Sequence, residues 1–130
     1  MNLHLSIYPR ARNIDKARKA IDRVQERLSR QMTIKNIERN SQDKSTFRVD
    51  CTIPLNGESA ESVLFESLQI CQTIAACWLL FGPEKRIDGH WEFHGHAQEH
   101  QMQMQGIKYA AFGISDGPIP EIIEVPVEEK

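Results

Sequence analysis

The 130-residue chain contains few cysteines and no long, uninterrupted apolar run, and both shortages exclude classes of protein. Its three cysteines, Cys51, Cys71 and Cys77, form no close metal-ligand pair, so we expect reduced, buried thiols rather than a disulfide framework. The most apolar stretch spans residues 63–81 but includes Glu66 and two glutamines, which argues against a membrane span.

Familiar catalytic patterns are also missing. The chain has no Gly-x-Ser-x-Gly element, and its glycines have neither the Walker spacing nor the dinucleotide-binding spacing. The N-terminus has no basic region followed by an apolar run, so no signal peptide is expected. We therefore predict a cytoplasmic protein that is not an enzyme and that uses no cofactor.

Opposite charges are separated along the chain, although the net charge is only −2. Residues 1–50 carry twelve Lys/Arg and six Asp/Glu, a net charge of +6, whereas residues 51–130 carry four and twelve, a net charge of −8. Such asymmetry can mark a surface for a charged partner. The alternative is that the fold interleaves the two halves and their charges compensate.

The length and an apolar content of 40% predict one domain with a single core, which we assign to residues 1–117. Residues 118–130 are rich in apolar residues but contain three prolines and four glutamates. This composition predicts an acidic C-terminal tail that the prolines prevent from forming a helix or an interior strand.

Alternating apolar and polar residues predict strands at residues 3–8, 33–39, 46–55, 88–96 and 107–114. A first helix should follow a cap at Asn13 and end near Met32. A second should follow a cap at Ser59, include Trp78 and end at Gly82-Pro83. The predicted order is β-α-β-β-α-β-β. Its simplest packing is an α+β, ferredoxin-like fold with two helices on one face of a mainly antiparallel sheet.

Four of the chain's five histidines lie within eleven residues, in a segment that alternates like a strand. In this interpretation Trp91 and Phe93 point into the core, and the histidines and Glu92 lie on the opposite face. The same alternation in the first and third strands extends that face. We therefore predict an open, polar sheet face that carries His4, Ser6, Tyr8, Arg48, Asp50, Thr52, His90, Glu92, His94 and His96.

A metal site built from His90, Glu92 and His94, with or without His4, is one alternative function, because imidazole and carboxylate groups suit zinc or another transition metal. Alternate residues on one strand are about 7 Å apart, however, so three in a row converge poorly on one ion. The His-x-Glu-x-His pattern also differs from the helical His-Glu-x-x-His of zinc proteases. We therefore predict no metal.

A small nucleic-acid-binding domain is the second alternative, because Arg23, Arg27 and Arg30 lie off the apolar stripe of the first helix. RNA-binding sheets stack bases on exposed aromatic rings. Only Tyr8 is predicted to point outward here, so nucleic acid is not the preferred partner.

The chain combines a compact α+β build with Trp78, the segment His90-Trp91-Glu92-Phe93 and a late strand, Gly106-Ile107-Lys108-Tyr109-Ala110-Ala111-Phe112-Gly113. In this build, over most of its length, it resembles the small immunity proteins of bacterial toxin-immunity systems, including contact-dependent growth inhibition. The resemblance implies a protein-binding module that binds and neutralises a cognate toxin domain, often a nuclease, in the producing cell. No functional residue is carried over from it.

An acidic surface would suit a basic toxin domain, because complementary charge speeds and orients association. We therefore expect a protein partner rather than a membrane or a nucleic acid, and the sequence does not predict the oligomeric state. We predict that the partner-binding residues are Glu84, Asp88, His90, Glu92, His94, Glu99, Arg48 and Asp50.

Overall fold

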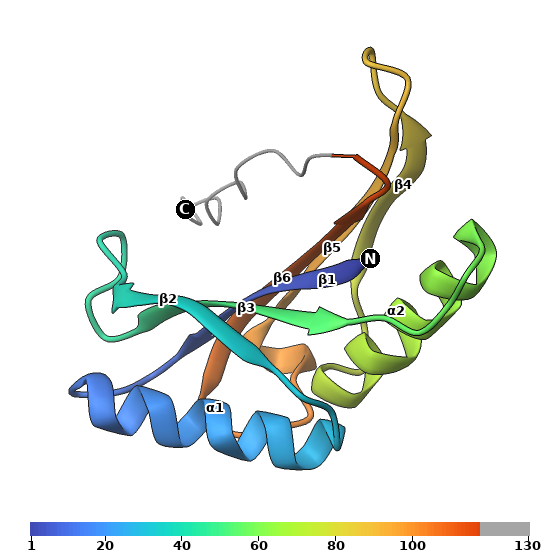
Figure 1. Cartoon of the computed structure of the whole chain (residues 1–130). Helices are drawn as coiled ribbons and strands as arrows, with labels where there is room; N and C mark the ends of the chain where they lie inside the picture. Colours follow the sequence, from blue (N-terminus) through green and yellow to red (C-terminus); the bar gives the residue numbers. More distant parts are fainter. Residues whose placement is uncertain (118–130) are drawn as a thin grey trace.

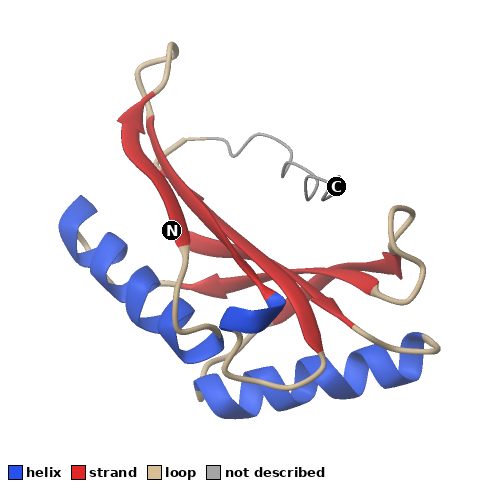
Figure 2. Cartoon of the chain, turned by 180° about the vertical axis from the view of Figure 1, so that it is seen from behind, coloured by secondary structure: helices blue, strands red, loops and turns tan. Residues whose placement is uncertain are grey.

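The structure is a computed structural model that describes residues 1–117. The predicted tail at residues 118–130 lies outside the described residues. Within residues 1–117 the chain forms a six-stranded antiparallel sheet, and the two long helices of this part lie on the same side of it (Figure 1, Figure 2). The predicted α+β class, with helices on one face of an antiparallel sheet, is confirmed.

The order of the strands differs from that of the predicted ferredoxin-like fold, and the sheet has a sixth strand. The elements along the chain are β1 (Asn2–Pro9), α1 (Ile14–Leu28), β2 (Thr33–Arg39), β3 (Phe47–Pro54), α2 (Ala60–Ile74), β4 (Leu79–Lys85), β5 (Trp91–Gln98), the 3₁₀ turn η1 (Glu99–Gln101) and β6 (Ile107–Ser115). Within the sheet the order is β2-β3-β1-β6-β5-β4, and every neighbouring pair is antiparallel. The prediction of five strands was wrong because β4, at one edge of the sheet, had been assigned to the end of the second helix.

Helix α1 begins where the sequence predicted. The Asn13 side chain accepts a hydrogen bond of 2.9 Å from the Lys16 N–H, which caps the first turn. The helix ends at Leu28, earlier than predicted, because Ser29 adopts a left-handed backbone conformation with φ of 56°. Its buried face consists of Ala17, Ala20, Ile21 and Val24.

Helix α2 also ends earlier than predicted, at Ile74, and Trp78 lies beyond it. The Trp78 indole Nε1 donates a hydrogen bond of 2.9 Å to the carbonyl oxygen of Cys71 in the last turn. Backbone hydrogen bonds join residues 74–76 to residues 101–103 and take the place of further helical bonds. The chain therefore leaves the helix and turns into β4.

The early end of α2 changes the environment of one cysteine. Cys51 and Cys71 are buried, as predicted, but Cys77 follows the helix and is exposed. Burial raises the pKa of the Cys51 thiol to about 12, so this side chain stays protonated at neutral pH.

An aromatic cluster connects the core to β4 and β5. The ring of Phe112 is buried, and the rings of Trp78 and Phe93 lie edge-on to it with centroid distances of 5.4 Å each. Gly95 leaves room for this ring, since a Cβ atom there would lie 2.9 Å from Phe112 Cε2. Phe112 therefore anchors both strands of the β4–β5 hairpin.

The predicted two-faced alternation of β5 is confirmed, with Phe93 buried against the helices and Glu92, His94 and His96 half-buried on the other face. Trp91 is half-buried rather than buried.

The prediction of an open, polar sheet face is partly wrong, because Ser6, Tyr8 and Thr52 are buried. The Ser6 hydroxyl donates a 2.6 Å hydrogen bond to the Asp50 carboxylate, and the Tyr8 ring lies edge-on to Tyr109. Large neighbours on adjacent strands therefore cover part of the polar face.

A loop carboxylate should make the stability of the fold depend on acid pH. Hydrogen bonds from Lys108 Nζ and from the Ser45 hydroxyl lower the pKa of Asp43 to about 2. This value is below that of an unfolded chain, about 3.9, so the stabilisation is present above about pH 4 and is lost as pH falls toward 2.

Asp43→Asn is therefore expected to lower the free energy of unfolding at pH 7 by about 1–2 kcal/mol, an amount reduced by solvent screening around the partly exposed Lys108. Urea unfolding at several pH values should show the difference from the wild type disappearing near pH 2. Asp22→Asn, on an exposed helical turn, is the control and should change little. An equal deficit of Asp43→Asn at pH 7 and pH 2 would contradict the assignment.

Candidate functional site

The β4–β5 hairpin, residues 79–98, brings together five of the eight predicted partner-binding residues. Glu84 lies in β4, Asp88 and His90 lie in the connecting turn, and Glu92 and His94 lie in β5. Figure 1 shows the hairpin extending beyond the other strands of the sheet. These side chains therefore share one projecting element.

The three other predicted residues lie elsewhere. Glu99, in η1 beyond the far end of β5, forms an ion pair of 2.7 Å with Arg10. Arg48 and Asp50 are on β3, separated from β5 by β1 and β6, and they form an ion pair of 3.1 Å with each other. The predicted set is therefore not a single site.

The turn of the hairpin is organised by the Asp88-Gly89 pair. Gly89 has a φ of +89°, which favours glycine, and its N–H donates to the carbonyl oxygen of Arg86. The Asp88 carboxylate accepts hydrogen bonds from the His90 N–H at 3.0 Å and from Arg86 at 2.9 Å. The bond from His90, together with the Arg86 charge, lowers the pKa of Asp88. This carboxyl therefore remains ionised at neutral pH.

A like-charged pair lies between the strands. Glu84 and Glu92 face each other directly in the β4–β5 register, an arrangement that destabilises a sheet. Arg86 is shared, because its guanidinium lies 2.9 Å from Asp88 and 3.8 Å from Glu92. Within residues 1–117, Glu84 forms no ion pair. A basic group from a partner would relieve this repulsion.

The turn end of the hairpin is joined to the end of β6. The Asp116 carboxylate accepts a hydrogen bond of 2.9 Å from the Trp91 N–H and lies 3.3 Å from His90 Nδ1. The Ser115 hydroxyl donates to the Trp91 carbonyl oxygen at 2.7 Å. These contacts hold the orientation of the projecting strands.

Exposed apolar side chains are the feature of the hairpin that sequence reasoning missed. Ile87 at the turn is fully exposed, and three consecutive residues of β4 are at least two-fifths exposed: Leu79 (56%), Leu80 (43%) and Phe81 (42%). An Asp-Gly pair beside an alternating strand is a strong hairpin signal, and it would have placed a strand before the turn.

The histidines of β5 stack with other rings. Phe81 stacks on His94 with a centroid distance of 5.2 Å and on His96 at 5.7 Å, and His96 stacks on Tyr109 at 5.6 Å. No group of three or more His, Cys, Asp or Glu side chains within residues 1–117 could hold a metal ion. The described residues therefore do not assemble the alternative metal set of His90, Glu92 and His94.

Two of the three arginines proposed for nucleic acid are used within the fold. Arg30 forms an ion pair of 2.6 Å with Glu66, and the Arg27 guanidinium donates to the Thr73 carbonyl oxygen at 3.2 Å. The Arg27 bond joins α1 to α2, and the Arg30 ion pair joins the segment after α1 to α2. Two of the basic side chains in and just after the first helix are therefore engaged by α2 rather than fully available to a ligand.

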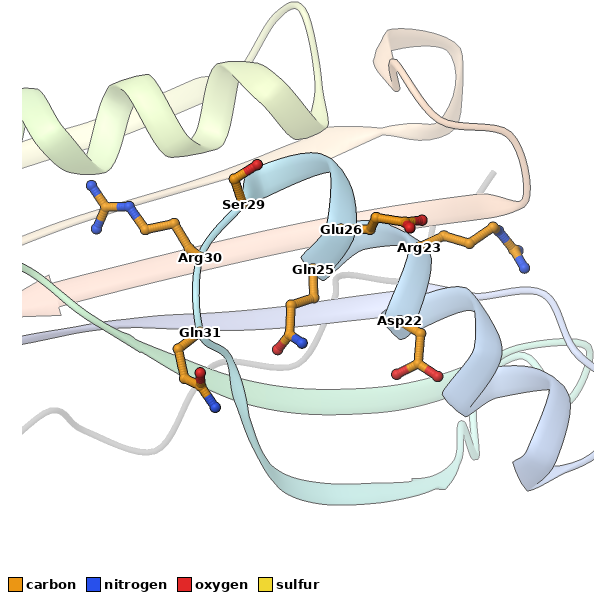
Figure 3. A pocket seen from close by; sticks show the side chains of 7 residues that line it. All are labelled: Asp22, Arg23, Gln25, Glu26, Ser29, Arg30 and Gln31. Carbon is orange, nitrogen blue, oxygen red and sulfur yellow. The ribbon is translucent and has the colours of Figure 1, made fainter.

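A shallow hollow lies at the C-terminal end of α1, and Figure 3 shows its side chains fanning out rather than converging. Its lining is polar and contains both charges: Asp22, Arg23, Gln25, Glu26, Ser29, Arg30 and Gln31. Gln25 accepts a hydrogen bond from the Met32 N–H, and Arg30 is paired with Glu66. The hollow offers no focused binding site.

No family model, curated protein or solved structure matches the chain. None of the helices in the described part of the chain has the length and apolar content needed to cross a membrane. The hairpin is thus the surface from which a function can be inferred.

Proposed function

We propose that the protein is a protein-binding module, namely an immunity protein that binds and neutralises a cognate bacterial toxin domain through the β4–β5 hairpin. The observation that carries the proposal is the presence of exposed apolar side chains and carboxylates together on one projecting element.

The apolar residues support a protein partner. Seven large apolar side chains are exposed within residues 1–117, and four of them, Leu79, Leu80, Phe81 and Ile87, lie on this hairpin. Neighbouring apolar side chains that stay exposed mark sites for protein partners, and aromatic residues are enriched at such sites. A toxin domain that covered the hairpin would remove these side chains from water.

The charges support a basic partner. Glu84, Asp88 and Glu92 lie together toward the turn end of the same hairpin, next to the apolar residues in sequence. Charged residues are typical of the rim of an interface. Complementary charge on the toxin would speed its association and set its orientation. A nuclease domain, which must bind a polyanion, is a partner with such a basic surface. The resemblance to immunity proteins adds the toxin class to this chemistry.

The proposal predicts that a neighbouring gene encodes a secreted protein with a toxic C-terminal domain, and co-expression of that domain tests it. Cells that make the toxin domain alone should stop growing, and cells that also make this protein should grow. The two purified proteins should form a stoichiometric complex. Continued growth arrest in the presence of folded immunity protein would refute the proposal.

Matched variants place the interface. Ile87→Asp, on the hairpin, should weaken the complex and reduce protection. Ile14→Asp, an equally drastic change on the exposed first turn of α1, should leave both unchanged. Equal effects of the two variants would show that the hairpin is not the surface that binds the toxin domain.

A further inference from the structure

The two edges of the sheet have different residues. Edge strand β2 carries charged side chains, including Lys35, Glu38 and Arg39, which discourage pairing with another strand. Edge strand β4 begins with the uncharged triplet Leu79-Leu80-Phe81, and Gly82, Pro83 and a register shift separate this triplet from Glu84. Within residues 1–117, the first half of the β4 edge, Leu79–Phe81, is thus better suited than β2 to accept another strand, because proline and a bulge protect the second half of β4.

The triplet is apolar on both faces of the sheet. Leu79 and Phe81 lie opposite His96 and His94 on one face, and Leu80 lies opposite Gly95 on the other. Such a sequence is typical of a central strand, which is covered on both faces, yet all residues of β4 are exposed. A strand added beside β4 would shield both faces at once, whereas a partner docked on one face would shield only one.

We infer that β4 accepts an extended strand of the partner, antiparallel to β4, with apolar residues opposite Leu79–Phe81 and a basic residue opposite Glu84. The antiparallel direction follows from the five strand pairs of the sheet, all of which are antiparallel. The basic residue would relieve the repulsion between Glu84 and Glu92. This inference rests on the proposed function, because the toxin domain supplies the strand.

A second copy of the chain does not meet these requirements. In an antiparallel pairing of two β4 strands, the register that places Leu80 opposite Leu80 leaves Glu84 opposite residues that precede the strand. The register that places Glu84 opposite Lys85 moves the apolar triplet opposite residues beyond Lys85, which lie outside the strand. Neither register satisfies both the apolar and the charged residues, so the partner strand comes from a different protein.

A capped synthetic peptide tests the edge without the toxin. Its sequence, Lys-Thr-Val-Val-Val-Thr, follows the register of β5, in which the partners of Phe81 and Glu84 are two residues apart. The valines then lie opposite the triplet and the lysine opposite Glu84. Amide NMR of the full chain should show saturable changes confined to β4 and its neighbours, with none on β2. Strand addition depends on main-chain hydrogen bonds, so a peptide N-methylated at alternate residues should bind at least tenfold more weakly.

A charge exchange tests the register. Glu84→Lys should lower the affinity for the lysine peptide by about three- to tenfold. A peptide with glutamate in place of lysine should bind this variant with the original affinity. Glu38→Lys on the β2 edge is the matched control and should leave both affinities unchanged.

Several outcomes would overturn the inference. These are no binding of the peptide at millimolar concentration, equal binding of the N-methylated peptide, or a concentration-dependent dimer of the chain that Leu80→Lys dissociates. A different result would contradict the proposed function alone: the protein would bind the peptide at β4 but would not neutralise the toxin. Neutralisation without peptide binding would reject the strand-addition mode alone.

Discussion

Phe112→Ala is expected to lower the free energy of unfolding by about 3–5 kcal/mol, because it removes a buried ring on which two others rest. Phe112 is 3% exposed and lies edge-on to Trp78 and Phe93. Its loss would leave a cavity beneath the point where β4 and β5 join the core, and each edge-on aromatic pair is itself worth about 0.5–1.5 kcal/mol.

Urea unfolding followed by circular dichroism measures this loss. Phe112→Leu keeps most of the volume and should cost less, about 1–1.5 kcal/mol. Tryptophan fluorescence gives a second readout, because Trp78 should become more exposed to water in the alanine variant and its emission should shift to the red. A loss under about 1 kcal/mol, with unchanged emission, would show that the neighbouring rings close the cavity and that Phe112 does not anchor the hairpin.

Reversing both Glu84 and Glu92 to lysine is expected to slow association with the proposed toxin partner by about tenfold or more at low salt. The two residues face each other, so the exchange replaces one like-charged pair by another and should leave the hairpin folded. At position 92 the exchange also replaces the 3.8 Å attraction to Arg86 by a repulsion of surface charges, which is weak, and circular dichroism of the variant checks that it folds.

Stopped-flow association at several ionic strengths measures the effect. The difference from the wild type should shrink as salt rises, because charges are screened over about 10 Å at 0.1 M. The double change of Glu26 and Glu58 to lysine is the matched control, because it alters the net charge equally at exposed positions away from the hairpin. An equal slowing by both variants would show that net charge, and not the hairpin, sets the association rate. No slowing by either would show that charge does not contribute to the rate.

The elements predicted correctly are those whose signals are local. The Asn13 cap and the recurrence of Ala17, Ile21 and Val24 specify α1, because helical hydrogen bonds and side-chain spacing involve residues close in sequence. The alternation along β3 and β5 specifies strands for the same reason. The fold class and the alternation in β5, with Phe93 turned to the core, could therefore be predicted.

The candidate site was predicted only in part. Glu84, Asp88 and Glu92 were selected by charge, and the structure places all three on one hairpin. Leu79, Leu80 and Phe81 were missed because a run of apolar residues following α2 fits a buried helix as well as a strand. Periodicity does not distinguish these two environments in a short segment.

The sequence by itself determined the local elements, the α+β class and the separation of charge between the two halves of the chain. Only the tertiary structure decided where α2 ends, since Trp78 reaches back to the carbonyl oxygen of Cys71 and residues 74–76 pair with residues 101–103. It alone also placed β4 at an edge. Strand order depends on contacts between residues far apart in sequence, and these contacts leave no periodic trace in the segments that they join.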